Sequence, residues 1–181
     1  GWAQGRPVPG DLYKYMEQAV DPVVLKVNGK SEALNLKHGF AAIERQWKKG
    51  DVVELTLPMA IRRVVAHEAI KDDAGLVAIE RGPIVYCLEG ADNKDVFSTV
   101  LPDDARMVAE RRDGLLGGVT VIKGDVMLAA KEDGGKTTTK PAGLVAIPYY
   151  AWCNRGPTEM NVWLARTAET AQRVSAKANR K

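Results

Sequence analysis

The stretch LVAIERGPIVYCLEGADN, residues 76–93, indicates the fold of this chain more clearly than any other segment. Two apolar runs, residues 76–80 and 84–88, flank a tight turn formed by Arg81, Gly82 and Pro83. Runs of this kind, bounded by turn residues, are typical of strands joined as a hairpin. A polar loop follows the second run. The stretch therefore predicts antiparallel β-structure, and it holds no arrangement of residues that could run a reaction unaided.

Similar signals continue in both directions along the chain. Asn28-Gly29 suits a two-residue hairpin turn, because both residues tolerate positive φ. Apolar positions 53, 55 and 57 alternate with polar ones, which predicts a strand with one buried face. Residues 123–125 are typical of a compact turn between two short strands, and residues 131–143 of a mobile loop. The other predicted strands are 23–27, 30–36, 40–45, 61–66, 96–101, 105–111, 119–122, 126–130, 144–153 and 160–165.

These short strands, regularly spaced and separated by Gly/Pro turns, predict an all-β protein. The expected fold is an antiparallel β-sandwich of the jelly-roll type. Only residues 167–181 favour helix, and no clear apolar stripe runs along them. We therefore expect a short C-terminal helix or a disordered tail.

The charge distribution argues against a nucleic-acid partner. The net charge is +3, but five Lys/Arg and one Glu lie from residue 166 onward, which leaves 21 basic and 22 acidic residues before them. A nucleic-acid-binding protein shows basic clustering on its folded body. No run approaches the roughly 18 apolar residues of a membrane span, and no signal peptide opens the chain. We expect neither a nucleic-acid nor a membrane partner, and the localisation is left open.

The two cysteines, Cys87 and Cys153, lie in apolar runs that are predicted as strands. Both are expected to be buried, because free cysteine usually packs as a small hydrophobe. A disulfide would need their Cα atoms within about 7 Å. Zinc takes about four Cys, His or carboxylate ligands at short spacing, and His38 and His67 lie next to neither cysteine. No metal ligand is therefore predicted.

Glu80 and Glu89 are the carboxylates that could suggest cleavage of a glycosidic bond. That chemistry needs two carboxyl groups about 5–10 Å apart across a sugar cleft. The neighbouring Arg81 favours a simpler interpretation, an ion pair or a clamp on the turn. No nucleotide-binding, metalloprotease or serine-hydrolase motif occurs in the chain. We therefore predict no catalytic and no cofactor-binding residue.

The aromatic residues of IPYYAWCNRG, residues 147–156, give a candidate binding surface. In a strand, Tyr150 and Trp152 would share one face and Tyr149 would take the other. With Trp163 they are the candidate carbohydrate-binding residues, because exposed aromatic rings stack on sugars. The alternative is that they belong to the core, since they stand in apolar runs. Trp47 and Trp163 in particular are expected to anchor the core.

Several segments, in one order, resemble the C-terminal region of glycoside hydrolase family 127, the beta-L-arabinofuranosidase-like proteins. They are Asn28-Gly29, GFAAIERQWKKGDVVELTLPM at residues 39–59, residues 76–93, and YAWCNRGPTEMNVWLA at residues 150–165. The resemblance runs from Gly1 to about Ala165. It implies β-sandwiches that follow a helical (α/α)6-barrel catalytic domain.

The resemblance also implies a domain organisation. Residues 1–66 would be an incomplete first sandwich, residues 67–165 a second sandwich, and residues 166–181 a basic tail. Because the first sandwich would lack strands, residues 23–57 are expected to pack on the second sandwich or to associate with a second copy. The family's catalytic machinery, a zinc-bound cysteine nucleophile with an acidic partner, belongs to the barrel, and no residue here matches it. We expect no cofactor in this chain, and zinc in the catalytic domain of its parent.

Two functions fit these expectations. The first is a non-catalytic accessory region that braces the parent's catalytic barrel or supports dimerisation. The alternative is a carbohydrate-binding module that uses exposed aromatics. The exposure of the four rings should distinguish the two, and the chain alone is expected to be inactive as a glycosidase.

Overall fold

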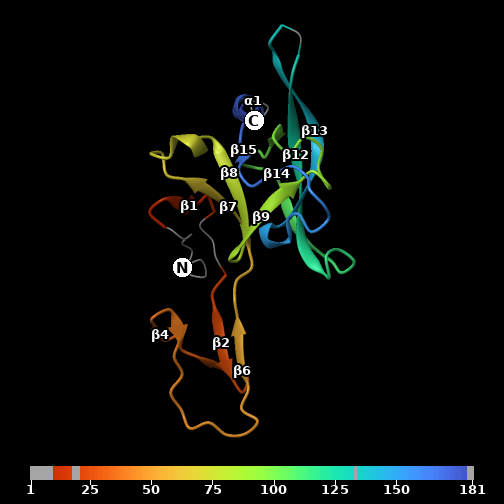
Figure 1. The fold of residues 1–181 in the computed structure, drawn as a ribbon. Helices are drawn as coiled ribbons and strands as arrows, with labels where there is room; N and C mark the ends of the chain where they lie inside the picture. The colour runs from red at the N-terminus through yellow and green to blue at the C-terminus, as the bar shows by residue number, and fades with distance from the viewer. Residues whose placement is uncertain (1–9, 18–20, 133, 179–181) are drawn as a thin grey trace.

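The computed structural model describes residues 10–17, 21–132 and 134–178, and most of its regular structure is β-strand (Figure 1). The strands of its sheets pair antiparallel, except that β10 (Thr99–Val100) runs parallel to β15 (Leu164–Ala165). The prediction of an all-β, sandwich-like fold is confirmed. Residues 1–9, where the family resemblance begins, and residues 179–181 of the basic tail lie outside the described residues.

The larger sheet curls around one core, because its strand pairings return to their start. β8 (Leu76–Arg81) and β9 (Ile84–Glu89) form the predicted hairpin across the Arg-Gly-Pro turn. From β9 the pairing continues through β13 (Thr137–Pro148), β12 (Val119–Lys131), β10 and β15, and β15 pairs with β8 again. The remaining strands of this sheet are β1 (Tyr13–Tyr15), β7 (Ile61–Ala66), β11 (Met107–Arg112) and β14 (Met160–Asn161).

The core follows from the alternation of side chains along these strands. In β9, Tyr86 and Leu88 point into the main apolar cluster, together with Ile79 of β8. The residues that alternate with them, Cys87 and Glu89, face the opposite side of the sheet. A second apolar cluster lies on that side and includes Cys87, Val119, Val121, Ile147 and Ala151. The sheet is therefore buried on both faces around β9.

The predicted turn at residues 123–125 is wrong, because these residues lie inside β12, a single strand of 13 residues. Gly124 pairs with Met107 on β11 and with Leu144 on β13. A Cβ atom at Gly124 would lie 3.0 Å from the carbonyl oxygen of Arg106 and 3.2 Å from Cγ of Met107. Glycine is therefore favoured here by the close approach of a neighbouring backbone and not by a turn.

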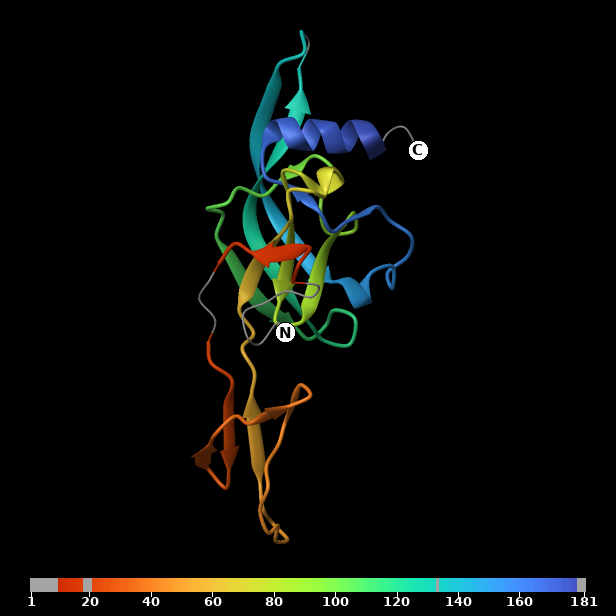
Figure 2. The same ribbon diagram turned by 90° about the vertical axis from the view of Figure 1, so that its left-hand side faces the viewer.

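The predicted mobile loop at residues 131–143 is also wrong. β12 and β13 stay paired from Ile122 opposite Ala146 to Lys131 opposite Thr137. The outer part of this hairpin projects beyond the rest of the sheet (Figures 1 and 2). Its polar residues fit a two-stranded ribbon that is exposed to solvent, which explains the absence of apolar anchors in the sequence.

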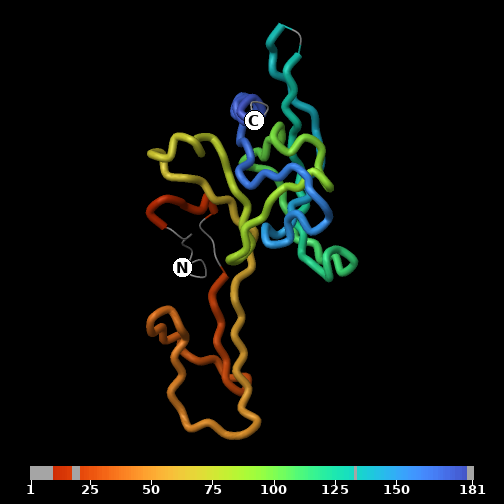
Figure 3. Tube along the Cα trace, viewed as in Figure 1, coloured from red at the N-terminus to blue at the C-terminus, as the bar shows by residue number. Residues whose placement is uncertain are grey.

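A smaller unit stands apart from the main body (Figures 1 and 3). β2 (Val24–Val27) pairs with β3 (Lys30–Glu32) on one side and with β6 (Val53–Thr56) on the other. β4 (Leu36–Lys37) and β5 (Phe40–Ala41) form a separate hairpin. The turn between β2 and β3 is the predicted one, with φ of 50° at Asn28 and 75° at Gly29. The segment 23–57 does not pack on the larger sheet in this structure.

The C-terminal helix α1 (Ala168–Ala178) packs against the larger sheet (Figure 2). Thr167 caps it, since its hydroxyl accepts a hydrogen bond from the Thr170 amide at 3.3 Å. Ala171 is fully buried, and Ala168 and Val174 pack on the same cluster. Of the two expectations for this segment, a short helix or a disordered tail, the structure has the helix. Its apolar stripe consists of alanines and one valine, which is why the sequence showed no clear stripe.

Candidate functional site

The aromatic residues of 149–156 form an exposed loop, which we call the aromatic loop. β13 ends at Pro148, and Tyr149–Ala151 form the short 3-10 helix η3. The predicted strand over residues 144–153 is therefore wrong at its end, and so is the assignment of Tyr150 and Trp152 to one strand face. Instead, Tyr149 and Trp152 stack, with ring centroids 6.2 Å apart and planes 26° apart.

Three of the four candidate carbohydrate-binding residues come together in this loop. Tyr149, Tyr150 and Trp152 are 46%, 68% and 36% exposed. Trp163 lies elsewhere, beside α1, where its indole packs on the cluster formed by Leu76 and Ala171. The expected core role of Trp163 is supported by this packing, although the ring is only partly buried.

A buried ion pair holds the aromatic loop against the sheet. Glu89 at the end of β9 has no exposed surface, and its Oε2 accepts a hydrogen bond from the Arg155 guanidinium. The other carboxylate oxygen, Oε1, accepts a bond from the Cys153 amide at 3.0 Å. Asp92 takes the second position on Arg155, with Nη1 and Oδ1 3.0 Å apart. The hydrogen bonds that Arg155 donates to Asp92 and, to a lesser extent, to Glu89 raise the pKa of Arg155, so this cation stays charged.

Sequence reasoning missed this network, because its members are far apart along the chain. The sequence pointed to the neighbouring Arg81 as the partner in an ion pair or as a clamp on the turn, whereas the partner of Glu89 is Arg155. The nearest local signal was the polar loop after β9. There Asn93 bonds Val145 of β13 in both directions, at 2.8 and 2.9 Å, which ties that loop to the sheet as well.

Glu80 and Glu89 do not form a pair of catalytic carboxylates. Both oxygens of Glu89 are used by Arg155 and Cys153. Glu80 accepts a hydrogen bond from the Tyr15 hydroxyl at 2.9 Å. Burial raises the pKa of Glu80, while Tyr15 and Arg62 act in the opposite direction. The contacts of Glu80 and Glu89 therefore support a structural role for both carboxylates.

The small unit carries an exposed apolar surface, which we call the apolar face. Leu25 and Val27 of β2 are buried, but Leu55 and Val53, directly opposite them on β6, are 50% and 48% exposed. The alternation along β6 predicts a buried face, but this side of β6 is exposed here, as expected for the inner face of a sandwich that lacks strands. The other large exposed hydrophobic residues in the unit are Leu34, Leu36, Phe40, Trp47, Val52 and Leu57.

Trp47 is not a core anchor. Its ring is half exposed, and the Arg45 guanidinium lies 5.2 Å from the ring centroid. Trp47 precedes a turn that is held by Asp51, whose carboxylate accepts hydrogen bonds from Asn28 and from the Lys48 amide. The residue therefore belongs to the exposed surface of the small unit.

The cysteines of this chain do not fit the family's zinc-bound nucleophile. Both are free, and Cys153 is exposed, which corrects the expected burial. Burial and the nearby charge of Glu89 raise the pKa of the Cys87 thiol to about 12, so it disfavours the thiolate that zinc binds. In the described part of the chain, no three His, Cys, Asp or Glu side chains gather as a metal site would require. No described helix is long and apolar enough to cross a membrane.

The fold and these surfaces define a β-rich region with two exposed apolar or aromatic surfaces. Residues 9–59 match the family model described as the middle domain of GH127 beta-L-arabinofuranosidase. Residues 61–165 match the model of the glycoside hydrolase family 127 C-terminal domain. The chain therefore belongs to glycoside hydrolase family 127, as the sequence indicated.

Known proteins of this family are similar to the chain over most of its length. A non-reducing end beta-L-arabinofuranosidase of Bifidobacterium longum subsp. longum is 38% identical over 158 residues, which cover 78% of this chain and 24% of the relative. A solved GH127 beta-arabinofuranosidase is 40% identical over 94% of this chain and 27% of its own, with a TM-score of 0.86. A GH127 beta-L-arabinofuranosidase from Geobacillus stearothermophilus T6 is 37% identical over 84% of this chain and 26% of its own, with a TM-score of 0.73. The chain thus spans about a quarter of the length of these relatives.

Proposed function

We propose that this chain is a non-catalytic accessory region of a glycoside hydrolase, and that its apolar face docks on the catalytic domain of the parent protein. The observation that carries the proposal is the half-exposed row of apolar side chains on β6. β6 is an edge strand, and unpaired edges with apolar side chains invite contact with another protein surface. An exposed apolar patch of this kind marks an interaction site.

The choice of occupant rests on length and family. Because the chain spans about a quarter of its relatives, most of a GH127 protein lies outside the matched region. The catalytic barrel and its zinc would then be supplied by the rest of the parent. A second copy of this chain is the other partner that could cover the apolar face. That arrangement would correspond to the expected support of dimerisation.

A matched pair of substitutions tests whether the apolar face is a contact surface. Val53→Lys places a charge on the exposed edge of β6, and Val108→Lys does the same on β11, where Val108 is 43% exposed. The chain is mixed with the catalytic region of a GH127 relative, and association is followed by light scattering at increasing concentration. Val53→Lys should weaken this association at least tenfold, and Val108→Lys should leave it unchanged. Association of the chain with itself that only Val53→Lys weakens would instead identify a second copy as the occupant. Equal association of the two variants with the catalytic region would contradict the proposal.

The same preparations test the absence of catalysis. The chain alone should give no turnover of aryl arabinofuranosides or of a panel of other aryl glycosides. Turnover that survives purification and is lost on Glu80→Gln or Glu89→Gln would show that the region is itself catalytic.

A second function, carbohydrate binding by the aromatic loop, is favoured by the exposure of Tyr149, Tyr150 and Trp152. The loop is also rigidly held, because the buried Glu89–Arg155 pair lies beneath it. Preorganised aromatic side chains bind with a small loss of conformational entropy. We rank it second because Tyr149 and Trp152 stack on each other and so cover part of each other's faces.

A further inference from the structure

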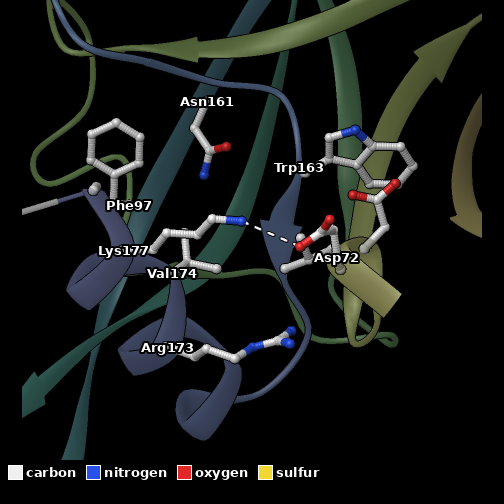
Figure 4. Close-up of a pocket in the computed structure, with 10 residues that line it drawn as sticks. Asp72, Phe97, Asn161, Trp163, Arg173, Val174 and Lys177 are labelled. Carbon is white, nitrogen blue, oxygen red and sulfur yellow. Dashed lines mark hydrogen bonds and ion pairs between the residues drawn. The ribbon is translucent and has the colours of Figure 1, made fainter. Parts of the chain in front are cut away.

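A pocket of about 680 Å³ is lined by residues that belong to neither the aromatic loop nor the apolar face (Figure 4). It opens between α1, the short 3-10 helix η2 (Lys71–Asp73) and the larger sheet. Its size is in the range of about 300–1,000 Å³ that is usual for small-molecule sites. Leu76, Phe97 and Val174 give it apolar walls.

Trp163 supplies a fixed aromatic surface in this pocket. Tyr13 of β1 lies against the indole, with ring centroids 5.7 Å apart and planes 33° apart. The ring also packs on the cluster that contains Leu76 and Ala171. An indole that is held on one side and lines a cavity on another offers an apolar surface for the C–H groups of a bound ring, while its N–H remains a potential donor.

The charges around the pocket balance, and the cations already have partners. Two carboxylates, Asp72 and Asp73, face two cations, Arg173 and Lys177. Nζ of Lys177 lies 3.3 Å from Oδ1 of Asp72, and Arg173 donates a hydrogen bond to the Ala74 carbonyl (Figure 4). An anionic ligand would meet two carboxylates, and a cationic ligand would meet two cations. The pocket therefore suits a ligand that is neutral overall and rich in hydroxyl groups.

Asn161 adds an oriented amide to this polar rim. Its Nδ2 donates to the Val96 carbonyl at 3.1 Å, and its Oδ1 accepts no hydrogen bond from any described residue. The side-chain oxygen Oδ1 of Asn161 is therefore free to accept a hydrogen bond from a hydroxyl group of a ligand. In Figure 4 the amide lies between Phe97 and Trp163, toward the interior of the pocket.

We propose that this pocket binds one neutral sugar residue, with the sugar ring against Trp163 and its hydroxyls hydrogen-bonded to Asn161 and to the Asp72–Lys177 pair. The indole, the balanced charges and the free amide oxygen are the three features that a neutral polyol ring satisfies together. The proposal does not depend on the docking of the apolar face, because no residue is shared between the two surfaces.

Nuclear magnetic resonance of the tryptophan indole N–H signals tests the proposal on the full chain. The chain has four tryptophans, so each indole signal can be assigned separately. L-arabinose and D-glucose serve as neutral probes, and D-glucuronate and D-glucosamine as charged ones, up to about 50 mM so that millimolar affinity is detected. The Trp163 signal should shift in a saturable way with a neutral sugar, and each charged sugar should bind at least tenfold more weakly.

Two substitutions on α1 provide the matched control. Ala178 lines the pocket, whereas Ala176, two residues earlier on the same helix, is exposed outside it. Ala178→Trp should fill the cavity and abolish the Trp163 shift, and Ala176→Trp should retain it. The proposal is overturned if Trp163 does not respond, if only Trp152 responds, if charged sugars bind equally well, or if the two variants behave alike.

Discussion

At the scale of single residues, Arg155 explains most about the aromatic loop. The loop contains few buried apolar side chains of its own, so its conformation depends on polar contacts. Arg155 bridges Glu89, which has no exposed surface, and Asp92 on a different loop. A buried carboxylate that loses its partner keeps its desolvation cost without compensation.

Replacement of Arg155 should therefore destabilise the folded chain strongly. Arg155→Met is expected to lower the free energy of unfolding by about 3–5 kcal/mol, the usual cost of breaking one partner of a buried ion pair. Arg166→Met is the control, since its pair with Asp103 is half exposed and such pairs contribute about 0–1 kcal/mol. Urea unfolding of both variants measures the difference. Equal losses would mean that Glu89 is solvated in solution.

The two cysteines should differ sharply in reactivity. Because burial and then Glu89 raise the pKa of Cys87 to about 12, its thiolate is scarce at neutral pH. Cys153 is exposed. In the folded chain one thiol, Cys153, should react with a disulfide reagent within seconds to minutes, and Cys87 only after unfolding. The Cys153→Ser variant should lose the fast reaction. A fast reaction of two thiols in the native chain would show that the cluster around Cys87 is open.

At the scale of elements, the sequence predicted what local patterns determine. The Asn28-Gly29 turn, the β8–β9 hairpin and β7 all follow from turn residues and strand-forming runs, and the structure has them. Gly124 shows where such reasoning fails: the same Lys-Gly-Asp triplet suits a turn or a crowded strand, and only the neighbouring strands decide. The prediction of a mobile loop at the polar residues 131–143 was wrong for a similar reason, because a protruding ribbon needs no apolar anchor.

The candidate site was predictable to a similar extent. The aromatic residues were found from their composition and clustering, but their directions depend on η3, which begins after Pro148. The ion pair beneath them joins residues 66 positions apart in the sequence. Such a pairing leaves no local signal, since it exists only once β9 and the loop meet.

Gly124→Ala tests whether β12 is continuous. The new methyl group would contact the Arg106 backbone, and overpacking of this kind typically costs about 1–3 kcal/mol. Gly143→Ala on β13 is the matched control, because no atom lies within 4 Å of its would-be Cβ. That variant should stay within about 0.5 kcal/mol of the unchanged chain. Thermal and urea unfolding give both values. If Gly124→Ala were as harmless as Gly143→Ala, residues 123–125 would not pack as β12 does here.

At the scale of the whole molecule, the two units have different characters. The larger sheet closes around its own core and is covered by α1 on one side. The small unit exposes several large apolar side chains and an unpaired strand edge. An uncovered apolar surface of this kind is typical of interaction sites, and it is the basis of the docking that we propose. Membership of GH127 supports a catalytic domain as that partner.

Hydrogen exchange tests this central claim most directly. Exchange should be measured on the chain alone and after mixing with the catalytic region of the 40% identical GH127 beta-arabinofuranosidase. That enzyme's own C-terminal quarter, mixed with the same catalytic region, is the positive control. If the apolar face docks on the catalytic region, amide exchange should slow in β6 and in the β4–β5 hairpin, and it should be unchanged in the outer half of the β12–β13 ribbon. Unchanged exchange in β6, while the enzyme's own C-terminal quarter is protected in its corresponding strand, would show that the apolar face does not dock on a catalytic domain.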